Sequence, residues 1–242
     1  MMINVHSYAS LGTLDGPGLR LVVFLQGCNF RCLYCANPDT IAEKGGTPTP
    51  IEEIVRMAVN QKIFFGKRGG ITFSGGEPLF QAKALVPLVL GLKEKGIHVC
   101  LDSNGGIWNE YVEKLLELID LVLLDIKEFN ITRHQTLTGR SNEQTIRTAA
   151  WLEEHEKTFW LRYVLLPEYS DFKEDICALG EAFGKYKMIQ QVEILPYHTL
   201  GIHKYEMIGQ EYKIKDLKEN TPEQIEKATD VFKQYFTTVV VN

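Results

Sequence analysis

Three cysteines crowd into one short segment of the chain. Cys28, Cys32 and Cys35 form a C-x3-C-x2-C pattern within eight residues. Thiolates are soft ligands that select zinc or iron–sulfur clusters. A structural zinc site takes four protein ligands, yet no His or Cys follows this segment until His98. The pattern therefore favours an iron–sulfur cluster with one iron left open, and a zinc loop completed by a distant histidine stays as the alternative.

The two remaining cysteines stand apart from this group. Five cysteines in all, three of them crowded together, indicate metal or redox chemistry rather than a disulfide framework. Cys100 lies in the apolar stretch 98–101, and Cys177 lies in a helical pattern. Lone cysteines in such places are usually small buried hydrophobes, so we expect neither to belong to the site.

A glycine-rich turn forms a second candidate element. Ser74, Gly75, Gly76 and Glu77 follow the apolar run 71–74. Glycines let the backbone approach a ligand closely, and Glu77 supplies an anionic partner. By itself this tetrapeptide is a weak signal, because most Gly-Gly pairs are simply turns.

Strands and helices must position these residues. The runs expected to form strands are 19–25, 71–74, 98–103, 121–127, 159–166 and 191–195, with an edge-like run at 237–241. Helix start signals occur at Thr49-Pro50, Ser141, Asp171 and Thr221-Pro222. The alternation predicts an α/β fold with parallel strands. We expect a single-domain partial (β/α)6 barrel over residues 1–242, because six units are too few for a full eight-unit barrel.

Unusual polar residues follow most of the expected strands. In parallel α/β folds, ligands bind at the carboxyl ends of the strands. The first strand leads into the cysteines, and the fifth carries Arg162 within it. The other polar groups lie at 74–78, 102–104, 125–127 and 196–198. The sequence therefore predicts one catalytic mouth that collects them all.

Composition limits the kind of partner. The chain has 242 residues, 45% hydrophobic and 24% charged, and its formal net charge is -5. A nucleic-acid surface would need a basic patch, so a protein partner or a small ligand is expected instead. The first twenty residues lack the apolar core of a signal peptide, and the apolar runs are too short to span a bilayer. We expect a soluble, cytoplasmic protein.

The cysteine pattern, with the aromatic Tyr34 directly before its last cysteine, resembles the signature of the radical S-adenosylmethionine superfamily. The turn at 74–77 is similar to that family's Gly-Gly-Glu turn. Within the superfamily the chain resembles the glycyl radical enzyme activases, most closely the pyruvate formate-lyase type, over roughly residues 4–241. The segments that carry this resemblance are Asp15-Gly16-Pro17-Gly18-Leu19-Arg20, Asn37-Pro38-Asp39-Thr40, Leu101-Asp102-Ser103-Asn104, Leu124-Asp125-Ile126-Lys127, Trp160-Leu161-Arg162-Tyr163-Val164 and Leu195-Pro196-Tyr197-His198, with Leu200-Gly201 and His203-Lys204.

The resemblance implies radical chemistry. In the family, three cysteines hold a 4Fe-4S cluster, and S-adenosylmethionine (SAM) chelates the fourth iron. An electron from the cluster cleaves the cofactor and gives a 5′-deoxyadenosyl radical. An activase uses this radical to abstract hydrogen from a glycine of a partner enzyme, here implied to be pyruvate formate-lyase. Reduced flavodoxin or ferredoxin is implied as the electron donor.

The resemblance also implies roles for individual residues. The implied cluster ligands are Cys28, Cys32 and Cys35. The positions implied to contact the cofactor are Tyr34, Gly75, Gly76, Glu77, Asp125, Ile126, Lys127 and His198. The positions implied for a monovalent cation are Asp102, Ser103, Asp125 and the Leu123 carbonyl, and those implied to meet the partner's glycine loop are Asp15, Gly16 and Arg162. Ala36 departs from the family, whose members often carry histidine there, and no ferredoxin-like insertion with further cysteines is present.

Plainer interpretations stay open for several of these residues. Lys127 and Asp102 also fit solvated charges at loop ends. Arg162 also fits a buried structural pair with Glu193, and His198 fits a side chain bonded only to backbone. The other histidines are expected to be structural: His6, His98, His134, His155 and His203. For the whole protein, the alternatives are another radical SAM enzyme acting on a small molecule, and a non-catalytic binding module stabilised by zinc.

Overall fold

The fold is built on one open sheet of nine strands. The computed structural model describes every residue from Met1 to Asn242. The strands follow one another in the order β3-β1-β2-β4-β5-β6-β7-β8-β9. Their bounds are β1 Met2–Gly12, β2 Arg20–Leu25, β3 Thr47–Pro50, β4 Gly70–Gly75, β5 His98–Ser103, β6 Leu121–Asp125, β7 Phe159–Leu165, β8 Ile189–Pro196 and β9 Val239–Val241. Strands β2, β4 and β5 pair in parallel, as do β7, β8 and β9, so the expected α/β fold with a mostly parallel, open barrel sheet is confirmed.

The chain divides into two compact units, and strand β6 contains the boundary. The first unit comprises residues 1–29 and 40–123, and the second comprises residues 30–39 and 124–242. The cysteine segment is divided as well, because Cys28 falls in the first unit whereas Cys32 and Cys35 fall in the second.

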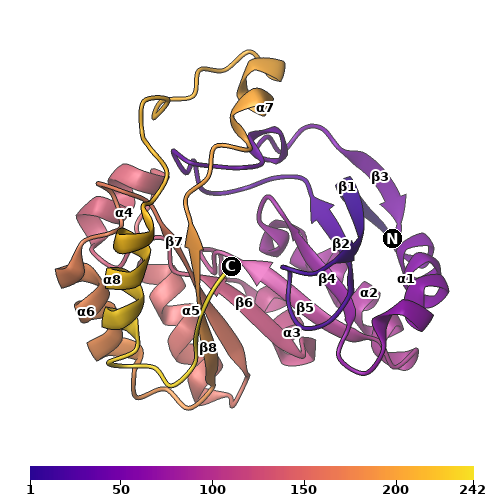
Figure 1. Cartoon of the computed structure of the whole chain (residues 1–242). Helices are drawn as coiled ribbons and strands as arrows, with labels where there is room; N and C mark the ends of the chain where they lie inside the picture. Colours follow the sequence, from indigo (N-terminus) through magenta and orange to yellow (C-terminus); the bar gives the residue numbers. More distant parts are fainter. The chain divides into compact units, whose positions relative to one another are not determined.

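Three α-helices accompany the strands of the first unit (Figure 1). Their bounds are α1 Ile51–Phe65, α2 Ala82–Glu94 and α3 Glu110–Leu118, and the short 3-10 helix η2, Pro78–Gln81, precedes α2. Helix α2 buries Leu85, Leu88 and Leu92, which recur at helical spacing along one face. Helix α3 begins where the Asn109 side chain accepts hydrogen bonds from two backbone N–H groups of the first turn.

Strands β2 and β4 set the position of the cysteine segment and the glycine turn. Both strands are almost continuously buried, which is typical of parallel strands covered on both faces. Their register places Leu25, the last residue of β2, beside Gly75, the last residue of β4. The chain therefore leaves both strands at the same edge of the sheet.

Five helices belong to the second unit. Their bounds are α4 Ile131–Thr138, α5 Glu143–Glu154, α6 Lys173–Phe183, α7 Ile202–Met207 and α8 Pro222–Phe232; the 3-10 helix η1 spans Pro38–Thr40. Helix α8 begins with a capping box at the predicted start: Thr221 Oγ1 accepts from Gln224 N, and the Gln224 side chain accepts from Thr221 N. Helix α6 is present too, but Asp171 does not cap it. That carboxylate accepts from Glu168 N at 2.8 Å and so stabilises its own turn.

Aromatic residues form a core cluster within the second unit, named here the tyrosine cluster. Its buried members are Leu137, Leu166, Tyr197, Tyr205, Tyr212 and Ile214. The hydroxyls of Tyr197 and Tyr212 lie 2.7 Å apart, so each buried phenol oxygen has a partner. The cluster packs against Leu33, Tyr34 and Cys35 of the cysteine segment.

Two strands were not predicted. Strand β1 is antiparallel to both β2 and β3, and these pairings extend the parallel sheet at one edge. The alternation along β1 is broken by register shifts and exposed positions, and β3 contains two prolines, which strands accept mainly at edges. Strand β6 also ends at Asp125, two residues before the predicted end.

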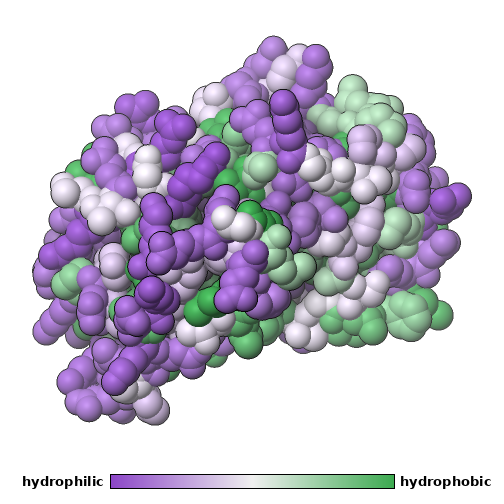
Figure 2. Space-filling view, turned by 90° about the horizontal axis from the view of Figure 1, so that it is seen from above, coloured by the Kyte–Doolittle hydropathy of each residue, from purple (hydrophilic) through white to green (hydrophobic).

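The face of the molecule drawn in Figure 2 is mainly polar. Hydrophilic residues cover most of the face in Figure 2, and apolar residues occur among them in small groups. None of the helices has the combined length and apolar character that a membrane span requires.

Candidate functional site

Cys28 lies three residues beyond the end of β2. Its backbone N donates to Ile41 O at 3.1 Å, and Gly27 N donates to Thr40 O at 2.8 Å. These two bonds fasten the start of the cysteine segment to the chain that returns after it. All five cysteines are free thiols, and Cys28, Cys32 and Cys35 are each half-buried. Cys100 is fully buried, as predicted, whereas Cys177 is only half-buried in α6.

Backbone hydrogen bonds join the glycine turn after β4 to the end of β2 and to the residues that lead to Cys28. Gly76 N donates to Leu25 O at 2.9 Å, and Glu77 N donates to Gly27 O at 2.7 Å. Gly75 has a φ of 109°, and a Cβ at Gly76 would lie 2.2 Å from Gly27 O. Both positions therefore need glycine, the first for its backbone conformation and the second for its close approach.

The Glu77 carboxylate faces the interior of the first unit. The residue is fully buried; its Oε1 accepts from Leu79 N at 3.0 Å and Ser103 Oγ at 2.7 Å, and its Oε2 accepts from Asn104 N at 2.7 Å. Burial raises the pKa of Glu77 to about 7. The carboxylate thus joins the ends of β4 and β5, and its direct contact with a cofactor stays a prediction.

The residues predicted to bind a cation lie at the ends of β5 and β6. Asp102 Oδ2 accepts from Ser74 Oγ at 2.6 Å. Ser103 Oγ accepts from Gly105 N at 2.9 Å while it donates to Glu77, so one lone pair of its oxygen remains for another partner. Leu123 is fully buried in β6 in the first unit, whereas Asp125 belongs to the second unit.

A buried arginine holds the loop that contains Asp15 and Gly16. Arg20 is fully buried at the start of β2; its Nη1 donates to Pro17 O at 2.9 Å and its Nε donates to Thr72 Oγ1 at 2.6 Å. Thr72 Oγ1 in turn donates to the Asp15 carbonyl at 2.6 Å. Gly16 is buried and the Asp15 side chain is half-buried. The backbone of the loop at Asp15 and Gly16 is therefore fixed.

In the second unit, the cysteine segment is tied to helix α4. Arg31 N donates to Thr138 O at 2.8 Å, and Leu33 N donates to Leu137 O at 3.0 Å. Cys35 N donates to Cys32 O at 3.2 Å, which forms a tight turn between the last two cysteines. This turn holds the backbones of the last two cysteines close together.

Cys35 lies against the tyrosine cluster. Burial raises the pKa of its thiol, and a backbone hydrogen bond from Asn37 and the charges of Lys127 and Lys204 partly offset that effect. Lys204, on α7, donates to Asn37 Oδ1 at 2.6 Å and so fastens the segment just after Cys35. A cationic side chain near a buried thiol favours the thiolate that a metal requires.

Tyr34, Asp125 and Lys127 form one group in the second unit. Lys127 Nζ lies 2.8 Å from Asp125 Oδ2 and 5.8 Å from the centre of the Tyr34 ring. Both charged side chains are only 15% exposed. Burial by itself lowers the pKa of Lys127, but the charges of Asp125, Tyr34 and Cys32 outweigh it and raise that pKa well above its usual value. Lys127 is thus a buried cation rather than the solvated loop charge of the plainer interpretation.

Tyr34 and Ile126 complete this region. The Tyr34 hydroxyl is buried and has no hydrogen-bond partner within the protein. Ile126 is almost fully buried, and its backbone N donates to Arg162 O at 3.0 Å. An orphaned hydroxyl beside a buried cation is the kind of feature that a polar ligand satisfies, so these residues fit a charged cofactor such as SAM.

Arg162 and His198 are predicted mouth residues whose surroundings in the structure differ from those of the others. Arg162 Nε lies 3.1 Å from Glu193 Oε2, with both side chains at most 10% exposed. This confirms the buried pair of the plainer interpretation, and a contact with a partner stays a prediction. His198 is exposed just beyond the end of β8. Ala36 packs closely against Gly201, where a Cβ would lie 2.7 Å from the Ala36 Cα.

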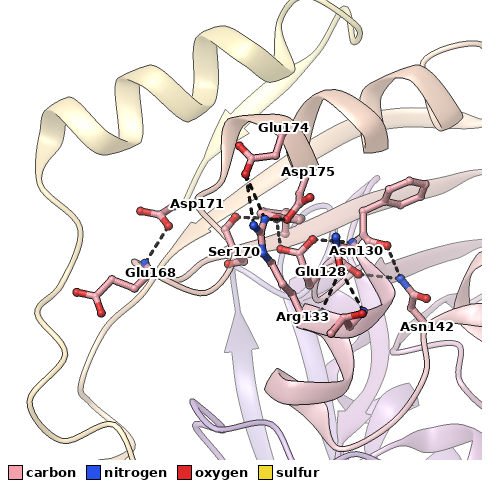
Figure 3. A network of polar contacts seen from close by, with 12 residues as sticks. Glu128, Asn130, Arg133, Asn142, Glu168, Ser170, Asp171, Glu174 and Asp175 are labelled. Atoms are coloured by element: carbon pink, nitrogen blue, oxygen red, sulfur yellow. Dashed lines mark hydrogen bonds and ion pairs between the residues drawn. The ribbon is translucent and has the colours of Figure 1, made fainter.

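A polar network around Glu128 was missed by the sequence analysis (Figure 3). Glu128 follows Lys127 and is fully buried; its Oε1 accepts from Asn130 N at 2.8 Å, and its Oε2 lies 3.2 Å from Tyr163 Oη. Tyr163 Oη also lies 2.7 Å from Ser170 O, and its one proton can serve only one of these acceptors. Burial raises the pKa of Glu128 to about 7, which favours a protonated carboxyl that donates to Tyr163 while Tyr163 donates to Ser170.

Three further residues hold or contact the predicted site residues in the two units, and these contacts were not predicted from the sequence. Arg20 belongs to the segment Asp15–Arg20 that carries the family resemblance. An arginine within an apolar strand could have indicated a buried side chain that holds neighbouring backbone in place. Asn104 was part of the predicted polar group at 102–104, but its contact with Cys28, which spans 76 residues of sequence, was not predicted. Tyr205 carried no sequence signal, because its place beside Cys35 depends on how helix α7 packs.

The chain has clear relatives. The sequence pattern of the Radical SAM superfamily matches residues 22–179. Pyruvate formate-lyase 1-activating enzyme of Escherichia coli (strain K12) is 39% identical over 235 residues, which cover 96% of each chain. Pyruvate formate-lyase-activating enzyme of Staphylococcus aureus (strain USA300) is 42% identical over 234 residues, which cover 93% of each chain.

Solved structures share the fold at low sequence identity. A domain of pyruvate-formate lyase-activating enzyme from Bacteroides vulgatus ATCC 8482 has a TM-score of 0.61 and 21% identity, covering 72% of this chain and 99% of that chain. Streptococcus suis SuiB bound to precursor peptide SuiA has a TM-score of 0.69 and 16% identity, covering 93% of this chain and 49% of that chain. At such identities the likeness concerns the fold alone.

Proposed function

This chain belongs to the radical S-adenosylmethionine superfamily, and from that membership we propose that it installs a glycyl radical in pyruvate formate-lyase. The observation that carries the proposal is the extent of the similarity. Activating enzymes of Escherichia coli and Staphylococcus aureus match 96% and 93% of this chain at 39% and 42% identity. Such coverage includes both compact units, so we propose that residues 1–242 act as one catalytic domain.

Cys28, Cys32 and Cys35 would hold the 4Fe-4S cluster. Their half-buried thiols form no disulfide, and no His or Cys follows them in the sequence until His98, which fits a cluster with one open iron. When bound, the cluster and SAM supply one-electron chemistry that makes a 5′-deoxyadenosyl radical able to remove hydrogen from glycine. The residues of the chain bind and orient the reactants and exclude water. We propose that the protein acts in the cytoplasm, where thiols stay reduced.

Residues at the ends of three strands would receive SAM. Lys127, already held by Asp125, can pair with a carboxylate, and the Tyr34 hydroxyl has a free hydrogen-bonding capacity. Glu77 acts as a positioning residue that fixes the glycine turn from inside. The proposed contacts are Tyr34, Gly75, Gly76, Glu77, Asp125, Ile126, Lys127 and His198.

The partner's glycine would enter beside Asp15, Gly16 and Arg162. Thr72 holds the backbone carbonyl of Asp15, and a carboxylate fixed in place in this way can accept from an amide of an extended glycine loop. The guanidinium of Arg162, whose Nε lies 3.1 Å from Glu193 Oε2, carries N–H donors of the kind that bind peptide carbonyls. Reduced flavodoxin or ferredoxin would supply the electron.

A monovalent cation is proposed at Asp102, Ser103, Asp125 and the Leu123 carbonyl. Carboxylate, hydroxyl and carbonyl oxygens suit a hard cation. Replacing added potassium and sodium by a bulky organic cation should lower activity in the wild type. Full activity after that exchange, together with a fully active Asp102→Asn variant, would exclude the site.

The central test is radical transfer. The anaerobically reconstituted protein is incubated with SAM, dithionite and pyruvate formate-lyase, and the glycyl radical is scored by its electron paramagnetic resonance doublet. We expect the doublet with pyruvate formate-lyase and none with a variant of that enzyme whose radical glycine is alanine. Cys32→Ala of this chain serves as the inactive control.

Two outcomes would contradict the proposal in different ways. Reductive SAM cleavage without any glycyl radical on pyruvate formate-lyase would point to another radical SAM enzyme that acts on a small molecule. Zinc without iron or sulfide in the anaerobically purified protein would favour the zinc-stabilised binding module.

A further inference from the structure

Asn104 lies directly after β5 and is only 5% exposed. Its side-chain Nδ2 lies 3.9 Å from Cys28 Sγ and 2.9 Å from Asn29 Oδ1. A side-chain amide nitrogen carries two protons. One proton can therefore go to Asn29 while the other points to the cysteine sulfur.

The orientation of this amide is fixed by its surroundings. Asn104 Oδ1 accepts from Gly106 N at 2.8 Å, and a backbone N–H can only donate. The oxygen must therefore face Gly106, and the NH2 group must face Cys28. Asn29 Nδ2 donates to Gly106 O at 3.2 Å, which holds the neighbouring amide as well.

The backbone of Asn104 is held from the other side. Its N donates to Glu77 Oε2 at 2.7 Å, and Glu77 is fully buried at the end of the neighbouring strand β4. The donor that faces the sulfur is thus anchored to the strand ends and does not depend on a flexible side chain.

We propose that Asn104 tunes the reduction potential of the cluster by donating a hydrogen bond to the Cys28 thiolate. This inference rests on the proposed function, in which Cys28 is a cluster ligand. Reduction adds one negative charge to the cluster, so an N–H donor at a ligand sulfur stabilises the reduced state more than the oxidised state. Asn104 therefore raises the potential and makes the cluster easier to reduce by the electron donor.

The test compares cluster potentials in variants of the reconstituted protein without SAM or partner. Asn104→Leu keeps the approximate side-chain shape and removes both N–H donors. Its reduction equilibrium should fall about tenfold, which corresponds to about 59 mV for a one-electron couple. The measurement is a redox titration followed by the electron paramagnetic resonance signal of the reduced cluster.

Asn29 provides the matched control. Asn29→Leu removes an amide of the same size next to Cys28, but its oxygen and not its N–H group faces the sulfur, so the potential should change much less than in Asn104→Leu. Equal shifts in the two leucine variants would mean that general polarity sets the potential, and this would overturn the inference. An unchanged potential in Asn104→Leu would overturn it too.

A second pair of variants covers the case in which Asn104→Leu fails to assemble a cluster. Asn104→Asp keeps an oxygen for Gly106 N but replaces the donor by an acceptor, whereas Asn29→Asp adds the same charge nearby and retains the donor. The potential should fall further in Asn104→Asp, and equal falls would overturn the inference. Failure of the proposed function looks different, because the wild-type protein would then form no cluster or would give no glycyl radical.

Discussion

Cys28 and Cys35 belong to one short motif, but their surroundings differ in kind. Cys28, in the first unit, lies beside side-chain amides, with Asn104 Nδ2 at 3.9 Å from its sulfur. Cys35, in the second unit, packs against the tyrosine cluster, and burial raises the pKa of its thiol. The Cys28 thiol thus lies in a polar network, whereas the Cys35 thiol lies at the edge of an aromatic core.

The difference shows that the three proposed ligands of one motif need not be equivalent. An amide donor stabilises negative charge on the sulfur of Cys28. Aromatic packing excludes water around Cys35 and disfavours its thiolate, so the proposed metal binding there would depend on nearby cations such as Lys127. Around Cys28, hydrogen bonds affect the charge on the sulfur, whereas around Cys35 burial affects it.

Removing a thiol should have the largest effect, in either region. Cys28→Ala and Cys35→Ala should both abolish the cluster, as should Cys32→Ala, because three ligands leave no spare. Cys100→Ala and Cys177→Ala are the controls and should keep full iron and sulfide content. Complete cluster assembly in any variant of the first three would show that the motif is not the ligand set.

The polar region should tolerate no extra atom at its glycine turn. A Cβ at Gly76 would lie 2.2 Å from Gly27 O, so Gly76→Ala must displace the chain just before Cys28. We expect a loss of at least ~2 kcal/mol in the free energy of unfolding, together with weaker SAM binding. Gly91→Ala adds the same methyl in helix α2, 3.4 Å from Val55 Cγ2, and should be neutral or stabilising in urea unfolding. Equal stability of the two variants would contradict this account of the turn.

The buried carboxylates of Glu128 and Glu77 should respond differently to replacement by a neutral glutamine. Burial raises the pKa of Glu128 from 4.5 to about 7. Between those pH values the unfolded chain loses the proton first, so stability falls as the pH rises and the loss of about 3 kcal/mol is complete above pH 7. Glu128→Gln should remove this loss, with a higher urea midpoint than the wild type at pH 8 and an unchanged one at pH 4.

Glu77→Gln is the comparison for that measurement. Both oxygens of Glu77 accept hydrogen bonds, from three donors in all, and a glutamine offers only one acceptor atom. This variant should therefore show no comparable gain at pH 8. Equal gains in the two variants would mean that burial alone governs both carboxylates.

The smallest expected effect concerns the tyrosine cluster. Tyr212→Phe removes the hydrogen bond between the Tyr212 and Tyr197 hydroxyls, which lie 2.7 Å apart, and should cost about 1 kcal/mol. The iron and sulfide content should stay unchanged, because the aromatic packing near Cys35 remains. Tyr8→Phe, at a residue 38% exposed, serves as the control in urea unfolding. A loss of iron in Tyr212→Phe would show that polar contacts matter in the second region as well.

The sequence by itself determined the local features of this protein. The spacing of Cys28, Cys32 and Cys35, the glycines at 75 and 76, and the start of helix α8 at Thr221 all depend on residues close together in the chain. The six expected strands appear as β2 and β4 to β8, because buried parallel strands leave continuous apolar runs that can be read directly. The fold class and the family followed from these local patterns.

Only the tertiary structure decided where the polar side chains point. Glu77 turns inward, Arg162 pairs with Glu193, and Asn104 reaches Cys28 across 76 residues of sequence. Strand β1 entered the sheet although its own alternation is irregular, since pairing with β2 and β3 satisfies its backbone. Such contacts depend on which strand ends the fold brings together, and residue types alone do not encode that choice.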